Sequence, residues 1–302
     1  MADTRAMTVF LTAVLPTALV AIVGIAIGRC FKLDVSTLAQ VNLYAMLPAL
    51  VLTSLLDLQI TAGRAVLMIA AFLINTGLLY LISLGLGYTL RISPDQRKSL
   101  MATTLFANVG NMGLPFILFS LGEAGLERAV IYLVISSLLI SSLFPIILQG
   151  TGLRASAQYS LKLPVLWAAL LGVGIQITPW DLPNALSQGL QLLGEGVVPL
   201  ALLTLGIQLA RSRFALGALE WIGAGLRLGV SPSLAYAIGR GLGLTGLDLQ
   251  VLVLQAAMPV AVSSLIWVTE LGGDASQVSR TIVLSTLLSF VTLPLLLHWG
   301  MG

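Results

Sequence analysis

The stretch from Phe106 to Pro115 reads Phe-Ala-Asn-Val-Gly-Asn-Met-Gly-Leu-Pro and lies inside the uncharged run Ser99–Gly122. Proline removes a backbone donor and crowds the preceding turn, and glycine tolerates the unwound backbone that follows. Backbone groups freed in this way cannot face lipid without partners, so the stretch must line protein or a wet cavity. Gly110, Gly113 and Pro115 therefore predict a broken helix at mid-membrane depth.

A second interrupted stretch, Ala257–Ser264, reads Ala-Met-Pro-Val-Ala-Val-Ser-Ser within the uncharged run Leu249–Thr269 and predicts a break at Pro259. Paired interrupted helices in corresponding positions are the best sequence indication of a transporter binding site. The half-helix N-termini at such breaks present backbone N–H groups that favour an anion. The alternative is a structural kink satisfied by neighbouring helices.

The composition indicates an integral membrane protein. Of the 302 residues, 58% are hydrophobic and 9% are charged, whereas soluble domains carry about 25% charged residues. So few charges cannot cover a soluble protein of this size, and the apolar excess must face lipid. We expect no soluble domain, and we expect the first apolar run to be retained rather than cleaved.

Ten segments are long and apolar enough to be predicted as membrane-spanning helices, or spans. Three need an exception or a tail: the seventh contains Glu195, the eighth contains Glu220 and Arg227, and the tenth ends near His298. In chain order the spans are Met7–Gly28, Val35–Leu56, Ala65–Leu90, Ser99–Gly122, Ala129–Leu153, Leu163–Trp180, Asn184–Ala210, Phe214–Gly239, Leu249–Thr269 and Thr281–Trp299.

The distribution of Lys and Arg predicts the orientation. Ten of these cations fall in the odd-numbered loops and four in the even-numbered loops and the N-terminal tail, while Arg227 lies within a span. The positive-inside rule then places the odd loops in the cytoplasm and both termini outside. The expected location is a bacterial inner membrane or a plasma membrane.

Prolines reveal an internal repeat. Pro16 pairs with Pro164, Pro48 with Pro199, Pro115 with Pro259 and Pro145 with Pro294, at separations between 144 and 151 residues. Both members of each pair fall in equivalent spans of the two halves. Because five spans is an odd number, the second half enters the membrane from the opposite side. The sequence thus predicts two inverted five-helix repeats, residues 1–153 and 154–302, an arrangement widespread among secondary transporters.

The two breaks together resemble the auxin efflux carrier family, which includes plant auxin exporters and bacterial permeases for malate, malonate and related acids. The likeness runs along the whole chain. It is carried by Leu47-Pro48-Ala49-Leu50, by the Asn-x-Gly-Asn-x-Gly-Leu-Pro signature from Asn108 to Pro115, by Met258-Pro259 with Gly272-Gly273-Asp274, and by Ser285 to Pro294.

The resemblance implies a fold related to bile-acid symporters and sodium/proton antiporters. Spans one, two, six and seven would form a scaffold and often a homodimer surface. Spans three to five and eight to ten would form a transport domain that moves as an elevator, with the breaks crossing at its centre. Many members of the family have asparagine where this chain has Ser263, so the substrate cannot be carried over.

The leading hypothesis is a secondary transporter of small organic anions, auxin-like or dicarboxylate. Its expected substrate contacts are Asn108, Asn111, Met258, Ser263 and Ser264. No cofactor is expected beyond a coupling proton or sodium ion, and membrane potential alone is a third energy source. Glu195 is a candidate coupling site, because a carboxylate inside a membrane is costly. It could equally lie near the outer interface.

Each of the other polar residues has a functional and a structural interpretation. Arg227 could be a counter-charge for the substrate or a structural partner of Glu220. Serine strips on spans five and ten, Ser136–Ser142 and Ser285–Thr292, could help to hold a ligand or allow close packing. Gly24-x-x-x-Gly28 is a weak dimerisation spacing.

Other function classes find little support. One cysteine, Cys30, and one histidine, His298, provide no disulfide, no Cys/His metal site and no embedded nucleophile–base pair. An enzyme and a nucleic-acid-binding protein are therefore not expected. A non-transporting ligand sensor and a channel-like anion pathway remain as alternatives; saturable flux and counterflow would separate a carrier from a channel.

Overall fold

The computed structural model describes residues 15–58, 60–149, 158, 161–178, 182–210 and 217–299. Over these residues the chain is helical between short connections, and the one extended pairing joins Ala107 to Val260. The expected all-helical class is confirmed. The predicted boundary between the repeats at residues 153 and 154, both chain ends and residues 7–14 of the first predicted span lie outside the described part.

The helices follow the predicted spans in order. In the first half they are α2 (Leu15–Cys30), α3 (Val35–Val41), the π-helical turn η2 (Asn42–Met46), α4 (Leu47–Leu56), α5 (Ala62–Thr89), α6 (Pro94–Leu105), the π-helical turn η3 (Val109–Gly113) and α7 (Leu114–Gln149). In the second half they are α9 (Pro164–Gln176), α10 (Asn184–Glu195), α11 (Val197–Ala210), α12 (Ala218–Gly225), the π-helical turn η4 (Leu226–Val230), α13 (Ser231–Gly241), α14 (Gly246–Ala256), α15 (Ser263–Leu271) and α16 (Ala275–Trp299).

Five helical segments of the described residues are long and apolar enough to cross a membrane. They are Val35–Leu56, Ala62–Thr89, Val109–Ser142, Asn184–Ala210 and Ala275–His298, and three shorter apolar helices accompany them, Leu15–Cys30, Pro164–Gln176 and Gly246–Ala256. Of the remaining predicted spans, the first is described only from Leu15, the sixth is a helix of 13 residues, the eighth runs through η4, and the ninth is divided by its break. The number of crossings, ten, stays a prediction.

Gly122 separates the predicted fourth and fifth spans. It lies inside α7 with φ 68° and ψ −168°, a conformation that L side chains rarely adopt. α7 therefore consists of two helical pieces, and the first of them completes the interrupted fourth span. At the other end of that span, α6 begins with a capping box in which Ser93 Oγ accepts from Gln96 N over 3.2 Å and Gln96 Oε1 accepts from Ser93 N over 3.1 Å.

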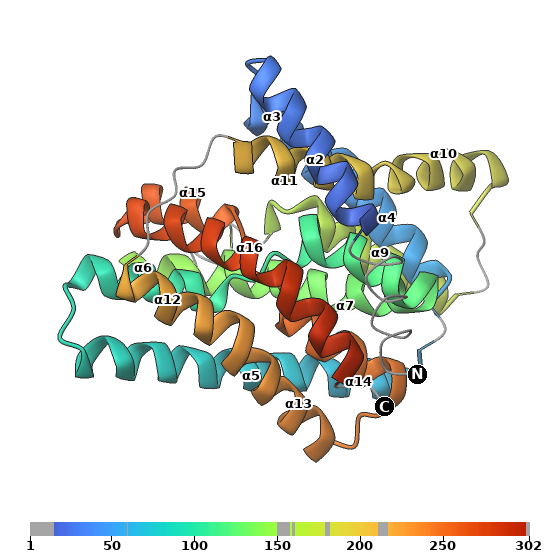
Figure 1. Ribbon diagram of the computed structural model, residues 1–302. Coiled ribbons are helices and arrows are strands. Elements are labelled where there is room, and N and C mark those ends of the chain that lie inside the picture. The colour runs from blue at the N-terminus through green and yellow to red at the C-terminus, as the bar shows by residue number, and fades with distance from the viewer. Residues whose placement is uncertain are drawn as a thin grey trace.

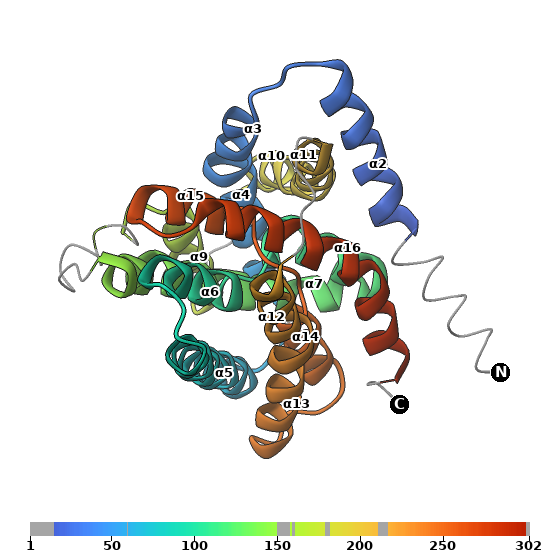
Figure 2. The same ribbon diagram turned by 60° about the vertical axis from the view of Figure 1, so that its left-hand side comes forward.

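The helices pack in two groups, which Figures 1 and 2 show from two sides. In both views α2, α3, α10 and α11 gather at the top, and α5 and α13 lie at the bottom. In the first group α2 and α3 pack on α11, and α4 packs on α9 and α10. In the second group α5 packs on α6 and α13, α14 on α7 and α13, and α16 on α6 and α12.

Glycines allow α2 and α11 to approach closely. A Cβ at Gly206 would overlap the carbonyl oxygen of Ala21, and one at Gly24 would overlap that of Leu203. A Cβ at Gly28 would lie 2.9 Å from Cα of Ile207. The Gly24-x-x-x-Gly28 spacing is thus used inside the chain, in the contact of the predicted first span with the seventh.

Ion pairs connect helices within the second group. The buried carboxylate of Asp248 on α14 accepts from Arg64 Nη1 and from Arg128 Nε, each over 2.6 Å. Glu220 on α12, also buried, accepts from Arg280 Nε on α16 over 2.6 Å. Arg280, and not Arg227, is therefore the cation paired with Glu220.

Candidate functional site

The two interrupted stretches cross each other at their breaks. Residues Phe106–Asn108 and Ala257–Val262 leave the helical conformation, and Ala107 and Val260 form an antiparallel bridge. Asn108 N donates to Pro259 O over 2.8 Å, and Ala261 N donates to Phe106 O over 2.9 Å. Each break thus satisfies backbone groups that the other one frees, which membrane depth requires.

The break in the first half lies before the proline. α6 ends at Leu105, Phe106 is extended, and helical structure resumes in η3, whose Gly113 N donates to Asn108 O over 3.0 Å. Pro115 is the second residue of α7, and Gly110 and Gly113 belong to the π-helical turn. Gly113 packs closely on the buried Gln255, because a Cβ there would overlap Oε1 and the end of that side chain would have to shift.

The break in the second half contains its proline and is hydrogen-bonded to α16. Pro259 is buried in the extended segment, and the next residue, Val260, donates its N–H to Ser285 Oγ over 3.1 Å. Met258 and Ser264 are fully buried, and Ser264 Oγ donates to Ala261 O over 2.6 Å. Both residues lie at the crossing, but neither lines the cavity described next.

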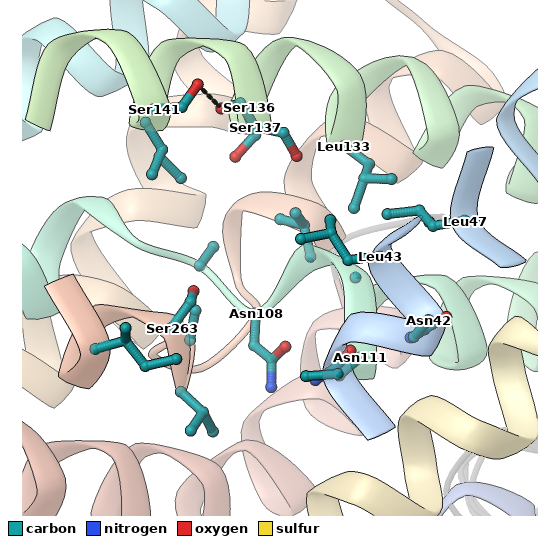
Figure 3. A pocket seen from close by; sticks show the side chains of 18 of the residues that line it. Asn42, Leu43, Leu47, Asn108, Asn111, Leu133, Ser136, Ser137, Ser141 and Ser263 are labelled. Atoms are coloured by element: carbon teal, nitrogen blue, oxygen red, sulfur yellow. Dashed lines mark hydrogen bonds between the residues drawn. The ribbon is translucent and has the colours of Figure 1, made fainter. Parts of the chain in front are cut away.

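A cavity of about 340 Å³ lies against the crossing. Asn108, Asn111 and Ser263 line it, as three of the expected substrate contacts, together with Gly110. Figure 3 shows Ser136, Ser137 and Ser141 of α7 along one wall, with Asn42, Leu43 and Leu47 on the neighbouring η2 and α4. The remaining lining includes Thr204 and Gln208 of α11 and the apolar side chains of Leu133, Ile140, Leu163, Ile266 and Trp267.

Asn108 is the most informative polar side chain of this cavity. It is 5% exposed, and its Nδ2 has no hydrogen-bond partner within the part of the chain that the structure describes. A buried amide donor that makes no hydrogen bond is costly. We therefore expect Asn108 Nδ2 to donate to an oxygen of a ligand or of water. On the facing wall, Asn42 Oδ1 is a buried acceptor that also has no hydrogen-bond partner among the described residues.

Two helices begin at the cavity. The first residues of η3 (Val109, Gly110, Asn111) and the first residue of α15 (Ser263) line it. The first amides of a helix have no acceptor within it and carry partial positive charge. Among the described residues that line this cavity, none is Lys, Arg, His, Asp or Glu. The site therefore offers an anion neutral donors instead of a fixed charge.

Glu195 lies elsewhere. It ends α10, its side chain is exposed, and it lines a separate cavity of about 620 Å³ with Asp57, Glu123 and Glu127. None of these residues lines the cavity at the crossing. The structure thus does not bring Glu195 together with Asn108 and Asn111.

Several lining residues were not among the expected contacts. Asn42, Thr204 and Gln208 lie on the predicted second and seventh spans, and Trp267 follows the second break. Single polar residues within apolar runs give no signal by themselves. The pairing of the second and seventh spans in the repeat was the one feature that could have indicated both Asn42 and Gln208.

Comparisons with known proteins agree with this architecture. A family model described as membrane transport protein matches residues 9–297. An uncharacterized transporter of Methanothermobacter thermautotrophicus is 32% identical over 274 residues, which cover 87% of this chain and 88% of that protein. An uncharacterized transporter of Methanocaldococcus jannaschii is 25% identical over 223 residues, 70% of each chain.

Proposed function

The chain belongs to the membrane transport protein family of auxin efflux carriers, and from this premise we propose that it is a secondary transporter of small organic anions. As a family member it is an integral membrane transporter and not an enzyme. The substrate and the mechanism are the proposal.

One observation carries the proposal: the buried Nδ2 of Asn108, which has no partner among the described residues, lies at a cavity where two helices begin. A carboxylate placed there would accept from Asn108, from the first amides of η3 and from the first amide of α15, that of Ser263; the next two amides of α15 donate to Ala261 O and Val262 O. Such charge-assisted bonds are about twice as strong as neutral ones. The helix ends supply the complementary charge without the desolvation of a lysine or arginine.

The rest of the lining favours a single carboxylate on an apolar body. Leu133, Ile140, Ile266 and Trp267 present apolar surface to the cavity. A second carboxylate set against these apolar side chains would lose its water, and the described lining offers it neutral hydroxyls and amides but no cation, at a cost of several kcal/mol. We therefore expect an aromatic or aliphatic monocarboxylate to bind more tightly than a dicarboxylate such as malate.

The ten spans and the inverted repeats, residues 1–153 and 154–302, are part of the proposal. The crossing supports it, since corresponding segments of the two halves pair with each other there. So do the helical interruptions at Phe106–Asn108 and Ala257–Val262, which fall in the predicted fourth and ninth spans.

An elevator movement fits the two packing groups. The group of α2, α3, α4, α9, α10 and α11 would be the scaffold, and the group of α5–α7 and α12–α16 would move. The cavity lies between them, because Asn42 and Thr204 come from the first group and Asn108 and Ser263 from the second. Movement of the second group would carry a bound anion past the scaffold. A homodimer through the scaffold also stays a prediction.

The predicted orientation assigns a side to the cavity. With odd loops in the cytoplasm and both termini outside, Ala39, Gln208 and Trp267 lie in the cytoplasmic halves of their predicted spans, and all three line the cavity. In this orientation the cavity would be reached from the cytoplasm, and the state would be ready to load an anion for export. Export down a potential of 100 mV is favoured by about 2.3 kcal/mol per charge, so no coupling ion is required.

Uptake of labelled indole-3-acetate and labelled malate into proteoliposomes tests the proposal. An imposed potential, then pH and sodium gradients, would drive flux in the natural chain, in Asn108→Ala and in Thr89→Ala, a control on the exposed end of α5. We expect saturable flux, faster for indole-3-acetate, that Asn108→Ala reduces at least tenfold and Thr89→Ala does not.

Counterflow separates the alternatives. Acceleration of labelled uptake by unlabelled acid inside the vesicles is expected of a carrier, whereas a channel gives none. Binding without flux under every gradient would instead identify a sensor. If neither acid binds or moves while the protein elutes as a folded species, the anion proposal is wrong.

A further inference from the structure

Arg227 lies at the centre of the second packing group, in η4, and is 2% exposed. Its Nη1 donates to Thr104 O over 2.8 Å, and its Nη2 donates to Ser231 Oγ over 2.7 Å and to Ala256 O. Ser231 Oγ in turn donates to Ala256 O over 2.8 Å. One guanidinium thus contacts elements from both halves of the chain.

The two carbonyl groups that accept from Arg227 lie at helix ends. Thr104 is the residue before the last of α6, and Ala256 is the last residue of α14. These helices are the two that end at the crossing. The last carbonyls of a helix lack N–H donors within it and carry partial negative charge, so the crossing brings two negative ends together.

No carboxylate neutralises this arginine within the described residues. Glu220 pairs with Arg280, and Asp248 pairs with Arg64 and Arg128. Apart from the hydroxyls of Ser231 and Tyr132, the hydrogen-bond partners of Arg227 among the described residues are the carbonyls of these two helix ends. In secondary transporters with interrupted helices, carbonyls at such ends are the groups that coordinate a coupling cation.

We propose that Arg227 is the resident cation of the crossing: its guanidinium occupies the place between the ends of α6 and α14 where a sodium ion would otherwise bind. The crossing then holds a fixed positive charge on the side of the helix C-termini, while the substrate cavity lies on the side of the helix N-termini. Arg227 is a positioning residue, since it acts on the substrate through the helix ends. The assignment of Arg227 does not depend on the proposed function. Only its consequence for transport, that anion movement needs no sodium, rests on that function.

Charge rescue tests the assignment without any substrate. Arg227→Ala leaves a site of guanidinium size, and the full-length purified variant is heated in detergent with low millimolar guanidinium chloride, urea or sodium chloride. Guanidinium and urea have similar shapes and differ in charge. We expect guanidinium to raise the Tm of Arg227→Ala by about 3 °C or more, as a specific ligand does, and urea to give no rise.

Two controls make the result specific. The natural chain and Arg97→Ala, which loses an arginine stacked on Tyr88 at 3.8 Å, are expected to show no rise with guanidinium. Equal responses of Arg227→Ala to guanidinium and urea, or no response to either, would mean that Arg227 only fills space. A rise in the Tm of the natural chain with sodium, absent with potassium, would also overturn the proposal.

If Arg227→Ala does not fold, Arg227→Lys and Arg227→Met give the same distinction. Both side chains fill similar volumes, and lysine alone keeps the charge. We expect more folded protein and a higher Tm for Arg227→Lys; equal values, or a higher Tm for Arg227→Met, would contradict a role for the charge.

The transport consequence has a separate readout. Flux of indole-3-acetate through the natural chain is expected to be equal in sodium and in potassium, and Arg227→Met is expected to bind this anion at least tenfold more weakly while it binds neutral indole-3-acetamide unchanged. Equal weakening for both compounds would indicate a structural role alone. Absence of flux in the natural chain would instead contradict the proposed function, and the thermal result would stand independently.

Discussion

The backbone N–H of Asn108 donates to the carbonyl oxygen of Pro259 over 2.8 Å, and this bond joins the two halves of the chain at their breaks. The same two segments are bonded a second time, through Ala261 N and Phe106 O over 2.9 Å. These bonds place Ala107 opposite Val260 as a non-hydrogen-bonded antiparallel pair, in which Cα atoms lie about 4.5 Å apart.

A disulfide can therefore be introduced across the crossing. In a Cys30→Ser background, the pair Ala107→Cys and Val260→Cys has a Cα separation in the range that disulfides require, about 4.4–6.8 Å. We expect oxidation to link the two cysteines within one molecule. Mass spectrometry after proteolysis and thiol alkylation detects the linked peptides.

A pair from two different hydrophobic clusters serves as the control. Ala71→Cys with Val260→Cys places one cysteine on α5, in a cluster that does not include Val260, and no link is expected. Equal linkage in both pairs, or linkage only between molecules, would contradict the crossing as described.

The close contact of α2 with α11 predicts a strong effect of one methyl group. Gly206→Ala would place its Cβ against the backbone of Ala21, which cannot yield as a side chain can. We expect a loss of about 1–3 kcal/mol in the free energy of unfolding, measured as a lower Tm in detergent.

Gly174→Ala is the matched control for Gly206→Ala. Gly174 lies in α9, and a Cβ there would meet no atom within 4 Å. We expect it to be neutral or slightly stabilising, because alanine favours helices over glycine by about 1 kcal/mol. Similar effects of the two substitutions would argue against tight packing of α2 on α11.

The two arginines that share Asp248 are expected to differ in importance. Arg64 is 49% exposed and Arg128 is 14% exposed, although each nitrogen lies 2.6 Å from the carboxylate. Water screens the first pair more than the second. Arg64→Ala should therefore cost less than about 1 kcal/mol, and Arg128→Ala should cost clearly more.

Chemical denaturation of the two single variants and of the double variant measures these costs. The double variant is expected to lose more than the sum of the single variants, because either arginine alone still neutralises the buried carboxylate. Equal costs for the two single variants would mean that exposure does not control their contribution.

The position of Glu195 predicts a limited role in binding. Its side chain is exposed and lines a cavity separate from that of Asn108. We expect Glu195→Gln to change the Kd for indole-3-acetate less than twofold. Binding to detergent-purified protein measures this value. Abolition of flux driven by a pH gradient, at unchanged binding, would assign the coupling proton to Glu195 after all.

The sequence predicted the interrupted segments but not their detail. Pro115 indicated a break, yet the backbone unwinds at Phe106–Asn108, because the second position of a helix accepts proline without strain. The bonds between the two breaks could not be read from either segment alone. A proline pattern indicates that backbone groups are freed and does not identify the partner that satisfies them.

Charged partners were the least predictable part of the site. Glu220 and Arg227 lie seven residues apart and suggested a local pair, but Arg280 from a distant helix reaches Glu220. Arg227 instead turns to the ends of two helices. Backbone carbonyls are invisible as partners in a sequence, because every residue carries one. Asn108, Asn111 and Ser263 were found because they lie within the interrupted stretches themselves.

The bond from Asn108 to Pro259 also has a consequence for biosynthesis. The ribosome delivers Phe106–Asn108 long before Pro259 and Ala261, so the nascent first half holds a backbone donor and acceptor whose partners have not yet been made. A chain that stops early keeps these groups exposed within the bilayer. Unpaired backbone groups of this kind can mark such a product for cellular quality control. Completion of the crossing pairs these groups and removes the mark.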